Sequence, residues 1–314
     1  MCGITGILSL DNLQVDVALL RRMMDVISHR GPDGSGFYSA GPVGLGHRRL
    51  SIIDLAGGAQ PISNEDDTLQ IVFNGEIYNF IELRGELEAA GHRFKTRSDT
   101  EVILHGYEEW GVDCVNRFNG MFAFAIWDQN KQRLFIARDH LGIKPLYYTR
   151  ISDRLLFASE IKALLEDPQC PRMVNLTALS QLFTLRFVPS PNTLFEGIQK
   201  LPPGHWMIAD TAGIRVERYW QWVPSVFSTA TEAELIDRYR YLVEDAVRLQ
   251  MRSDVPVGLF LSSGVDSAAL LALMASMRAR RSAPSPSASR TAKNRTRRGM
   301  PEPSRSASAR STTR

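Results

Sequence analysis

The sequence predicts an α+β protein, in which antiparallel sheets and helices occupy separate layers. Strand-like segments come in pairs, such as 121–128 and 133–138, and helix-like segments also come in pairs, such as 83–91 and 102–110. The chain has 314 residues, of which 44% are hydrophobic, so it is long enough for two domains with buried cores.

The predicted elements follow from the apolar periodicity along the chain. The strands are predicted at 2–10, 44–53, 69–73, 76–80, 121–128, 133–138, 155–158, 205–209 and 214–219. The helices are predicted at 15–28, 83–91, 102–110, 160–165, 176–183, 231–251 and 268–277. Ser98 and Glu101 have the spacing of a capping box, and Ser159 is a candidate cap for the helix that follows it.

Several polar residues near predicted strands have two interpretations. Asn74-Gly75 favours a tight hairpin turn, but the Asn74 amide and the Gly75 N–H could instead form an oxyanion hole. Arg48 and Arg49 lie on opposite faces of the predicted strand 44–53. An arginine at the mouth of this apolar strand suits a two-pronged grip on a carboxylate, although a solvated arginine pair is the alternative. Asp99 is not used by the capping box and is free to point elsewhere.

Cys2 is the candidate nucleophile. Removal of Met1, which the small Cys2 side chain permits, would place a thiol and a free α-amine on one residue. With pKa values near ~8.5 and ~7.7–8.0, the amine can take the thiol proton and return it to a leaving group. The alternative is that Cys2 is only an early small residue. His29 is a candidate second base, but a single histidine in a turn is more often structural.

The composition indicates a reduced, cytoplasmic protein. The cysteines Cys2, Cys114 and Cys170 are far apart and indicate neither a disulfide framework nor a zinc site, so no metal ligand is assigned. The longest apolar run, 121–127, is far too short to span a bilayer, and no leader sequence opens the chain.

The net charge of +3 has two unequal sources. Residues 278–314 hold ten Arg and one Lys against a single Glu, a net of +10, and this leaves −7 for the remainder. The basic segment has no aromatic residue on which bases could stack, so nucleic acid is not predicted as a partner.

A second candidate site follows the apolar run 255–261, which is typical of a buried parallel strand. The run leads into the loop Ser262-Ser263-Gly264-Val265-Asp266-Ser267 and then into a helix. A strand, a loop with glycine and hydroxyls, and a helix N-terminus together form a phosphate cradle, because the loop N–H groups and the helix dipole favour an anion. An ordinary capped turn between strand and helix is the alternative.

Seven sequence elements occur in a characteristic order between Cys2 and about Met277. They are Met1-Cys2-Gly3-Ile4, His29-Arg30-Gly31-Pro32-Asp33-Gly34, His47-Arg48-Arg49-Leu50-Ser51-Ile52, Phe73-Asn74-Gly75-Glu76-Ile77-Tyr78-Asn79, Ser98-Asp99-Thr100-Glu101, Arg138-Asp139 with Gly142-Ile143-Lys144-Pro145-Leu146-Tyr147-Tyr148, and the Ser262 loop. Each is weak alone, but together they resemble the glutamine-dependent asparagine synthetases. The resemblance implies an N-terminal-nucleophile, four-layer αββα class II glutamine amidotransferase domain at 2–220. It also implies an α/β ATP-pyrophosphatase domain, of the adenine nucleotide hydrolase type, of which 230–277 would be a truncated start. The tail at 278–314 has almost no apolar residues and is therefore expected to be disordered.

The resemblance implies roles for the first group of residues. Cys2 would attack the side-chain amide of glutamine, form a glutamyl thioester and release ammonia, without a cofactor. Asn74 and Gly75 would hold the oxyanion, a role worth ~3–4 kcal/mol per donor. Arg49 would bind the α-carboxylate of glutamine, while Glu76 and Asp99 would hold its α-ammonium. The other implied glutamine-binding positions are Leu50, Ser51 and Ile52.

The resemblance also implies an ATP site at Leu261, Ser262, Ser263, Gly264, Asp266 and Ser267, with Mg²⁺ on the phosphates. ATP would activate the β-carboxylate of aspartate as an acyl-adenylate, and ammonia arriving through an internal tunnel would displace AMP. Ser263 replaces a glycine of the family motif. Its added Cβ and hydroxyl predict reduced or absent nucleotide affinity if the position needs positive φ or close approach of phosphate.

The predicted function is therefore that of a glutamine-hydrolysing asparagine synthase, with glutamine, aspartate and ATP as substrates and a homodimer left open. The periodicity ends after Met277, so we expect an incomplete synthetase half and a tail that is out-of-frame or truncated translation of a longer gene. The alternatives are a glutaminase alone, an amidotransferase for another acceptor in envelope or polysaccharide biosynthesis, and a non-catalytic protein that binds through its basic tail.

Overall fold

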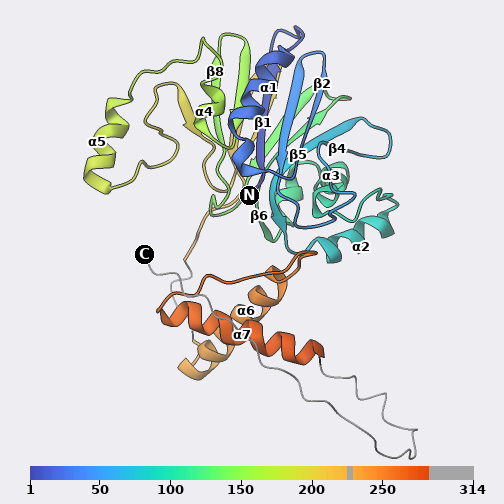
Figure 1. Cartoon of the computed structure of the whole chain (residues 1–314), viewed down its shortest axis with the longest axis vertical. Coiled ribbons are helices and arrows are strands. Elements are labelled where there is room, and N and C mark those ends of the chain that lie inside the picture. The colour runs from blue at the N-terminus through green and yellow to red at the C-terminus, as the bar shows by residue number, and fades with distance from the viewer. Residues whose placement is uncertain (225–228, 283–314) are drawn as a thin grey trace, which may run out of the picture. The chain divides into compact units, whose positions relative to one another are not determined.

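The computed structural model describes residues 1–224 and 229–282 (Figure 1). The chain divides into two compact units, Met1–Phe260 and Leu261–Arg314, and each is considered by itself. Most of the tail predicted to be disordered lies outside the described residues, but its positions 278–282 belong to helix α7 (Val265–Ser282). None of the described helices has the length and apolar character that a membrane span requires.

Two antiparallel six-stranded sheets form the centre of the first unit. Sheet A has the order β10-β8-β9-β1-β3-β2 and consists of β1 (Gly3–Ser9), β2 (Gly34–Ala40), β3 (Val43–Arg49), β8 (Tyr147–Ile151), β9 (Arg154–Ala158) and β10 (Ile198–Lys200). Sheet B has the order β12-β11-β7-β6-β5-β4 and consists of β4 (Ile62–Ser63), β5 (Leu69–Ile77), β6 (Gly120–Asp128), β7 (Arg133–Arg138), β11 (His205–Asp210) and β12 (Gly213–Arg218).

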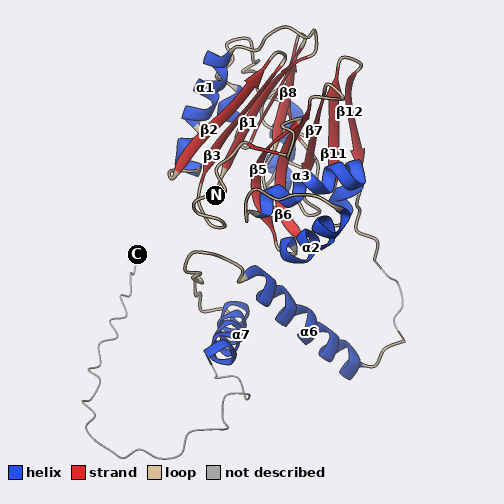
Figure 2. Ribbon diagram, turned by 90° about the vertical axis from the view of Figure 1, so that its right-hand side faces the viewer, coloured by secondary structure: helices blue, strands red, loops and turns tan. Residues whose placement is uncertain are grey.

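Helices cover the outer face of each sheet, which gives four layers (Figure 2). Helices α1 (Val17–Val26) and α4 (Ile161–Leu164) pack on sheet A, and α2 (Phe80–Ala90) and α3 (Asp99–Trp110) pack on sheet B. A third core fills the space between the sheets. The predicted four-layer αββα sandwich is therefore confirmed. The unit also contains α5 (Leu176–Leu185) and α6 (Glu232–Gln250).

Strand β6 shows how the sequence builds these layers. Its side chains alternate between two cores, because successive residues of a strand point to opposite faces. Phe122 and Phe124 join the core under α2 and α3, whereas Ala123 and Ala125 join the core between the sheets. All four are fully buried. Burying one phenylalanine side chain contributes about 1.5–3 kcal/mol, so this strand fixes sheet B between its neighbouring layers.

The hairpin interpretation of Asn74-Gly75 is wrong. Strand β5 continues through both residues and pairs with β6 from Leu69 to Ile77. The glycine serves a close approach, because a Cβ at Gly75 would lie 2.2 Å from the carbonyl oxygen of Met121.

Of the two predicted helix caps, one forms in part and the other does not form. Ser98 accepts a hydrogen bond from the Thr100 N–H, but the Glu101 carboxylate accepts from the N–H groups of Lys95 and Thr96, so the capping box is half formed. The Ser159 hydroxyl accepts from the N–H of Ile4 at 3.0 Å and does not cap α4.

The strand predicted at 255–261 is irregular in the structure. Among the described residues no strand follows β12, and the run belongs to neither of the two sheets. Phe260 and Leu261 are consequently exposed.

Candidate functional site

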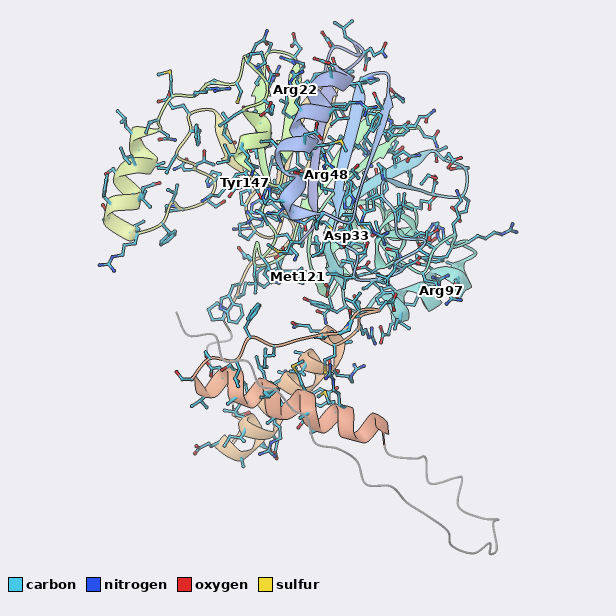
Figure 3. All side chains as sticks on the ribbon, in the orientation of Figure 1. Arg22, Asp33, Arg48, Arg97, Met121 and Tyr147 are labelled. Carbon is cyan, nitrogen blue, oxygen red and sulfur yellow. The ribbon has the colours of Figure 1, made fainter. Side chains whose placement is uncertain are left out.

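One pocket of about 350 Å³ collects most of the residues predicted to bind glutamine. Figure 3 labels Met121, which lines this pocket. Cys2 immediately precedes β1, and β1 pairs with β3 so that Gly3 lies opposite Arg48, beside Arg49. The predicted residues that line the pocket are Cys2, Arg49, Leu50, Ile52, Asn74, Gly75, Glu76 and Asp99.

The Cys2 thiol is partly buried against the backbone of Leu50. The Leu50 N–H donates to Sγ at 3.3 Å, and Sγ lies 3.5 Å from the Leu50 carbonyl oxygen. Arg30 fixes the Cys2 backbone, because its Nε donates to the Cys2 carbonyl at 2.8 Å. Burial raises the pKa of the Cys2 thiol, so the nucleophile needs a base to take its proton.

Asn74 is buried at 1% exposure, yet neither Oδ1 nor Nδ2 of its side chain has a hydrogen-bond partner. A buried polar group left unpaired costs about 1–3 kcal/mol, so such a group is typical of a binding site. The side chain lines the pocket that also contains the Cys2 thiol. An Asn74 amide with its donor free can bind the oxyanion that forms when a thiol attacks an amide.

The Arg49 guanidinium is positioned by the loop that follows β3. It donates to the carbonyl oxygens of Leu55 at 3.1 Å, Ile53 at 3.4 Å and Asp54 at 2.6 Å. Among the described residues no carboxylate lies within salt-bridge distance of Arg49, although the side chain lines the pocket. The pocket therefore holds a cation that a substrate carboxylate can pair with.

Two carboxylates lie in the same pocket. Asp99 is buried and accepts a hydrogen bond from the Ile77 N–H at 2.9 Å. Burial, with a further contribution from the Glu76 carboxylate, raises the pKa of Asp99 to about 7. Burial also raises the pKa of Glu76. A substrate cation would stabilise the ionised form of both, so the arrangement suits an ammonium group.

Ser51 and His29 do not line the pocket. The Ser51 N–H donates to the Asp33 carboxylate at 2.8 Å, so the prediction that Ser51 contacts glutamine gains no support. His29 Nε2 lies 2.9 Å from the Glu160 carboxylate, which also binds Arg30 at 3.0 Å. His29 therefore has a structural role, because it contacts the carboxylate that holds Arg30 in place. The prediction that His29 is a second base gains no support.

Lys144 also lines the pocket, and no role was predicted for it from the sequence. It is buried at 5% exposure, and the Asp139 carboxylate fixes its backbone by accepting from the Lys144 N–H at 3.0 Å. Burial lowers the pKa of its ammonium. The only sequence signal was its place in the Gly142-Ile143-Lys144-Pro145 turn after Arg138-Asp139, because no periodicity marks a lysine that points inward.

The predicted ATP loop lies in the second unit. The Ser262 hydroxyl lies 2.9 Å from the Ser267 hydroxyl, and it accepts from the Gly264 N–H at 3.2 Å. The loop residues are exposed, apart from half-buried Ser267. Ser263 is not among the described residues with positive φ, so the part of the prediction that rests on a strained backbone gains no support.

Residues 1–220 match the family described as the glutamine amidotransferase domain, and residues 238–306 match the family described as asparagine synthase. The second match extends beyond Met277, where the resemblance seen in the sequence ended.

Two curated relatives are asparagine synthetases [glutamine-hydrolyzing] 3 and 1 of Bacillus subtilis, each 44% identical. The matches cover 88% and 87% of this chain but only 45% and 44% of those proteins. The resemblance to this family is thus confirmed, and the chain spans less than half the length of these relatives.

A solved structure with a similar fold is the glutamine phosphoribosylpyrophosphate amidotransferase from B. subtilis. It is 18% identical, has a TM-score of 0.53, and the match covers 88% of this chain and 64% of that chain. At this identity the likeness supports the fold alone.

Proposed function

The chain belongs to the family of glutamine amidotransferase domains, and from this premise we propose that it hydrolyses glutamine to glutamate and ammonia through Cys2. The observation that carries the proposal is the unpaired amide of buried Asn74, in a pocket that also holds a thiol, an arginine and two carboxylates. These groups match the side-chain amide, the α-carboxylate and the α-ammonium of a free glutamine.

In the proposed reaction the Cys2 sulfur attacks the side-chain amide carbon of glutamine and a glutamyl thioester forms. The electron pair of the broken C–N bond leaves with the nitrogen, which takes up the one proton that came from the thiol and departs as ammonia. Water then cleaves the thioester, which releases glutamate and restores the thiol. Asn74 and the Gly75 N–H would stabilise the oxyanion in both steps.

The base in this scheme is the α-amine of Cys2. In the structure Met1 precedes Cys2, so the Cys2 nitrogen is an amide, and the scheme requires that Met1 be removed. The α-amine of Met1, one residue before this nitrogen, is partly buried, and burial lowers its pKa. A similar burial of the Cys2 α-amine would favour the neutral form that accepts a proton.

We also propose that the ammonia serves ATP-dependent amidation of aspartate, as the names of the relatives suggest for those proteins. The domain division proposed is 2–220, 230–277 and 278–314. The loop of Ser262, Ser263, Gly264 and Ser267, with Leu261 before it, would hold ATP phosphates. Asp266 is the one carboxylate in the loop, so a Mg²⁺ ion there would be held chiefly by phosphate oxygens.

A cytoplasmic location remains part of the proposal and is supported by three free cysteines among the described residues. A homodimer remains open. If the synthetase half is inactive in this chain, the function reduces to that of a glutaminase.

The test is glutamate release from glutamine by the full chain, measured with and without ATP, Mg²⁺ and aspartate. Cys2→Ala should abolish release, whereas Cys170→Ala, at a buried cysteine outside the pocket, should retain it. Glutaminase activity that survives in Cys2→Ala would refute the proposal. Asparagine formed only with ATP and aspartate would support the synthetase half, and glutamate alone would leave a glutaminase.

A further inference from the structure

The first unit contains a second group of titratable side chains, none of which lines the glutamine pocket. It comprises Glu65 from the β4–β5 loop, His92 after α2, and His105 and Glu108 on α3. One ligand-type atom from each lies within 4.8 Å of those of the other three. These four residues are called the His–Glu cluster below.

Both imidazoles of the His–Glu cluster present Nδ1 to the same two carboxylates. Nδ1 of His105 lies 2.7 Å from Glu108 Oε2 and 3.6 Å from Glu65 Oε2. Nδ1 of His92 lies 3.7 Å from Glu108 Oε2 and 3.9 Å from Glu65 Oε1. In a tetrahedral zinc site with bonds of about 2.0–2.2 Å, neighbouring ligand atoms are roughly 3.3 Å apart. Small side-chain rotations would therefore close the cluster on an ion.

The opposite nitrogen of each histidine also faces a carboxylate. His92 Nε2 lies 3.2 Å from Glu109 Oε2, and His105 Nε2 lies 3.4 Å from Glu101 Oε1. Glu101 is itself buried and is fixed by the Lys95 and Thr96 N–H groups. Histidines that bind metals characteristically hold the ion with one nitrogen and a carboxylate with the other. His92 has this arrangement through a hydrogen bond to Glu109, whereas His105 Nε2 lies near Glu101 without a hydrogen bond to it.

The charge around the His–Glu cluster is strongly negative. Four carboxylates surround two imidazoles, and among the described residues no Lys or Arg side chain forms a salt bridge with any of the four. A proton on His105 can balance part of this charge. Burial opposes protonation of His105, but the Glu101 and Glu108 carboxylates outweigh the effect of burial and raise the pKa of His105 to about 9. A divalent ion would neutralise more of this charge and would explain why both Nδ1 atoms converge.

We propose that Glu65, His92, His105 and Glu108 form a structural binding site for a zinc-type divalent ion. Imidazole ligands favour zinc over magnesium or calcium, and four protein ligands complete a tetrahedral site without an open position for substrate. The ion would join the β4–β5 loop, the α2–α3 connection and α3. Its role is to hold α3, whose first residue is Asp99.

The test uses the full chain in a Cys2→Ala background, because a free thiol also binds zinc. Protein stripped with a chelator is titrated with Zn²⁺, Co²⁺ or Mg²⁺. We expect one Zn²⁺ per chain, visible absorption bands of four-coordinate Co²⁺, and no binding of Mg²⁺. Zinc at about a hundredfold excess over its dissociation constant should raise the unfolding midpoint by about 5 °C or more.

Matched variants locate the ion. His92→Ala and Glu108→Gln should weaken zinc binding at least tenfold, and Glu109→Gln should weaken it by about tenfold through the outer nitrogen of His92. Glu86→Gln, an exposed carboxylate of α2 that pairs with Arg117, is the control and should bind as before. Neither measurement depends on glutaminase activity. Absence of stoichiometric zinc, or equal affinity in His92→Ala, would overturn the proposal and leave an ion-pair network around a protonated His105.

Discussion

The two units of this chain differ in what surrounds their sequence motifs. In the first unit, the residues predicted to bind glutamine lie just before β1, on β3 and just after it, on β5 and on α3. Three packed cores hold these elements in place. In the second unit, the predicted ATP loop precedes a single described helix, and Leu261 and Val265 are exposed at 60% and 83%. A motif can perform chemistry only where neighbouring elements fix its groups, so we expect the glutamine site to be complete and the ATP loop to be much weaker.

The largest effect is expected at Asn74, the proposed oxyanion donor of the first unit. Asn74→Ala should lower kcat for glutamate release by about 10²–10³, because the amide acts on charge that develops only in the transition state. Steady-state kinetics on glutamine measures this. The control is Asn192→Ala, since Asn192 lies outside the pocket and its side chain donates to Gln181 at 3.3 Å. A change confined to KM would contradict the assigned role.

A smaller effect is expected at Arg49, the residue proposed to bind the substrate carboxylate. Arg49→Lys keeps the positive charge but loses the planar fork, so KM for glutamine should rise about tenfold while kcat changes little. Arg22→Lys is the matched control, because Arg22 is half exposed and pairs weakly with Glu166 at 4.0 Å. Equal KM values for the two variants would show that Arg49 does not bind the substrate.

The carboxylates of the pocket predict that the affinity for glutamine depends on pH. With a pKa of about 7, Asp99 is about one tenth ionised at pH 6 and about nine tenths ionised at pH 8. Only the ionised form attracts an ammonium, so glutamine should bind about tenfold more tightly at pH 8 than at pH 6. Calorimetry with Cys2→Ala measures this without turnover and without titration of the thiol. In Cys2→Ala with Asp99→Asn, the dependence should largely disappear; an unchanged dependence would assign it to another group.

The smallest effect on glutamate release is expected from the second unit. Ser263→Gly should leave the rate within about twofold, because it lies outside the glutamine pocket. The same change should tighten binding of MgATP, measured by calorimetry, because it removes a side chain where phosphate would approach. An unchanged dissociation constant for MgATP would refute the role given to Ser263.

The sequence predicted the first unit well because its signals are local. The alternation in β6 determines which side chains enter which core, and this pattern is visible without tertiary information. Contacts between distant segments were not visible. Asn74-Gly75 has the form of a turn, but pairing with β6 keeps it within a strand, and the burial of Lys144 depends on how its turn packs.

The apolar run 255–261 shows the converse limit. Its composition is that of a buried strand, but a strand forms only where another strand pairs with it, and the run joins neither of the described sheets. The His–Glu cluster also joins residues that lie 40 or more positions apart in the sequence, such as Glu65 and Glu108. No spacing in the sequence therefore indicated the cluster.

The central claim is that a terminal cysteine, freed from Met1, attacks glutamine in this pocket. The most direct measurement is peptide mass spectrometry after the active protein has been inactivated by an electrophilic glutamine analogue. The account predicts one adduct per chain, on Cys2 of a peptide that lacks Met1, and protection by excess glutamine. An adduct on Cys114 or Cys170, or full activity in protein that retains Met1, would contradict it.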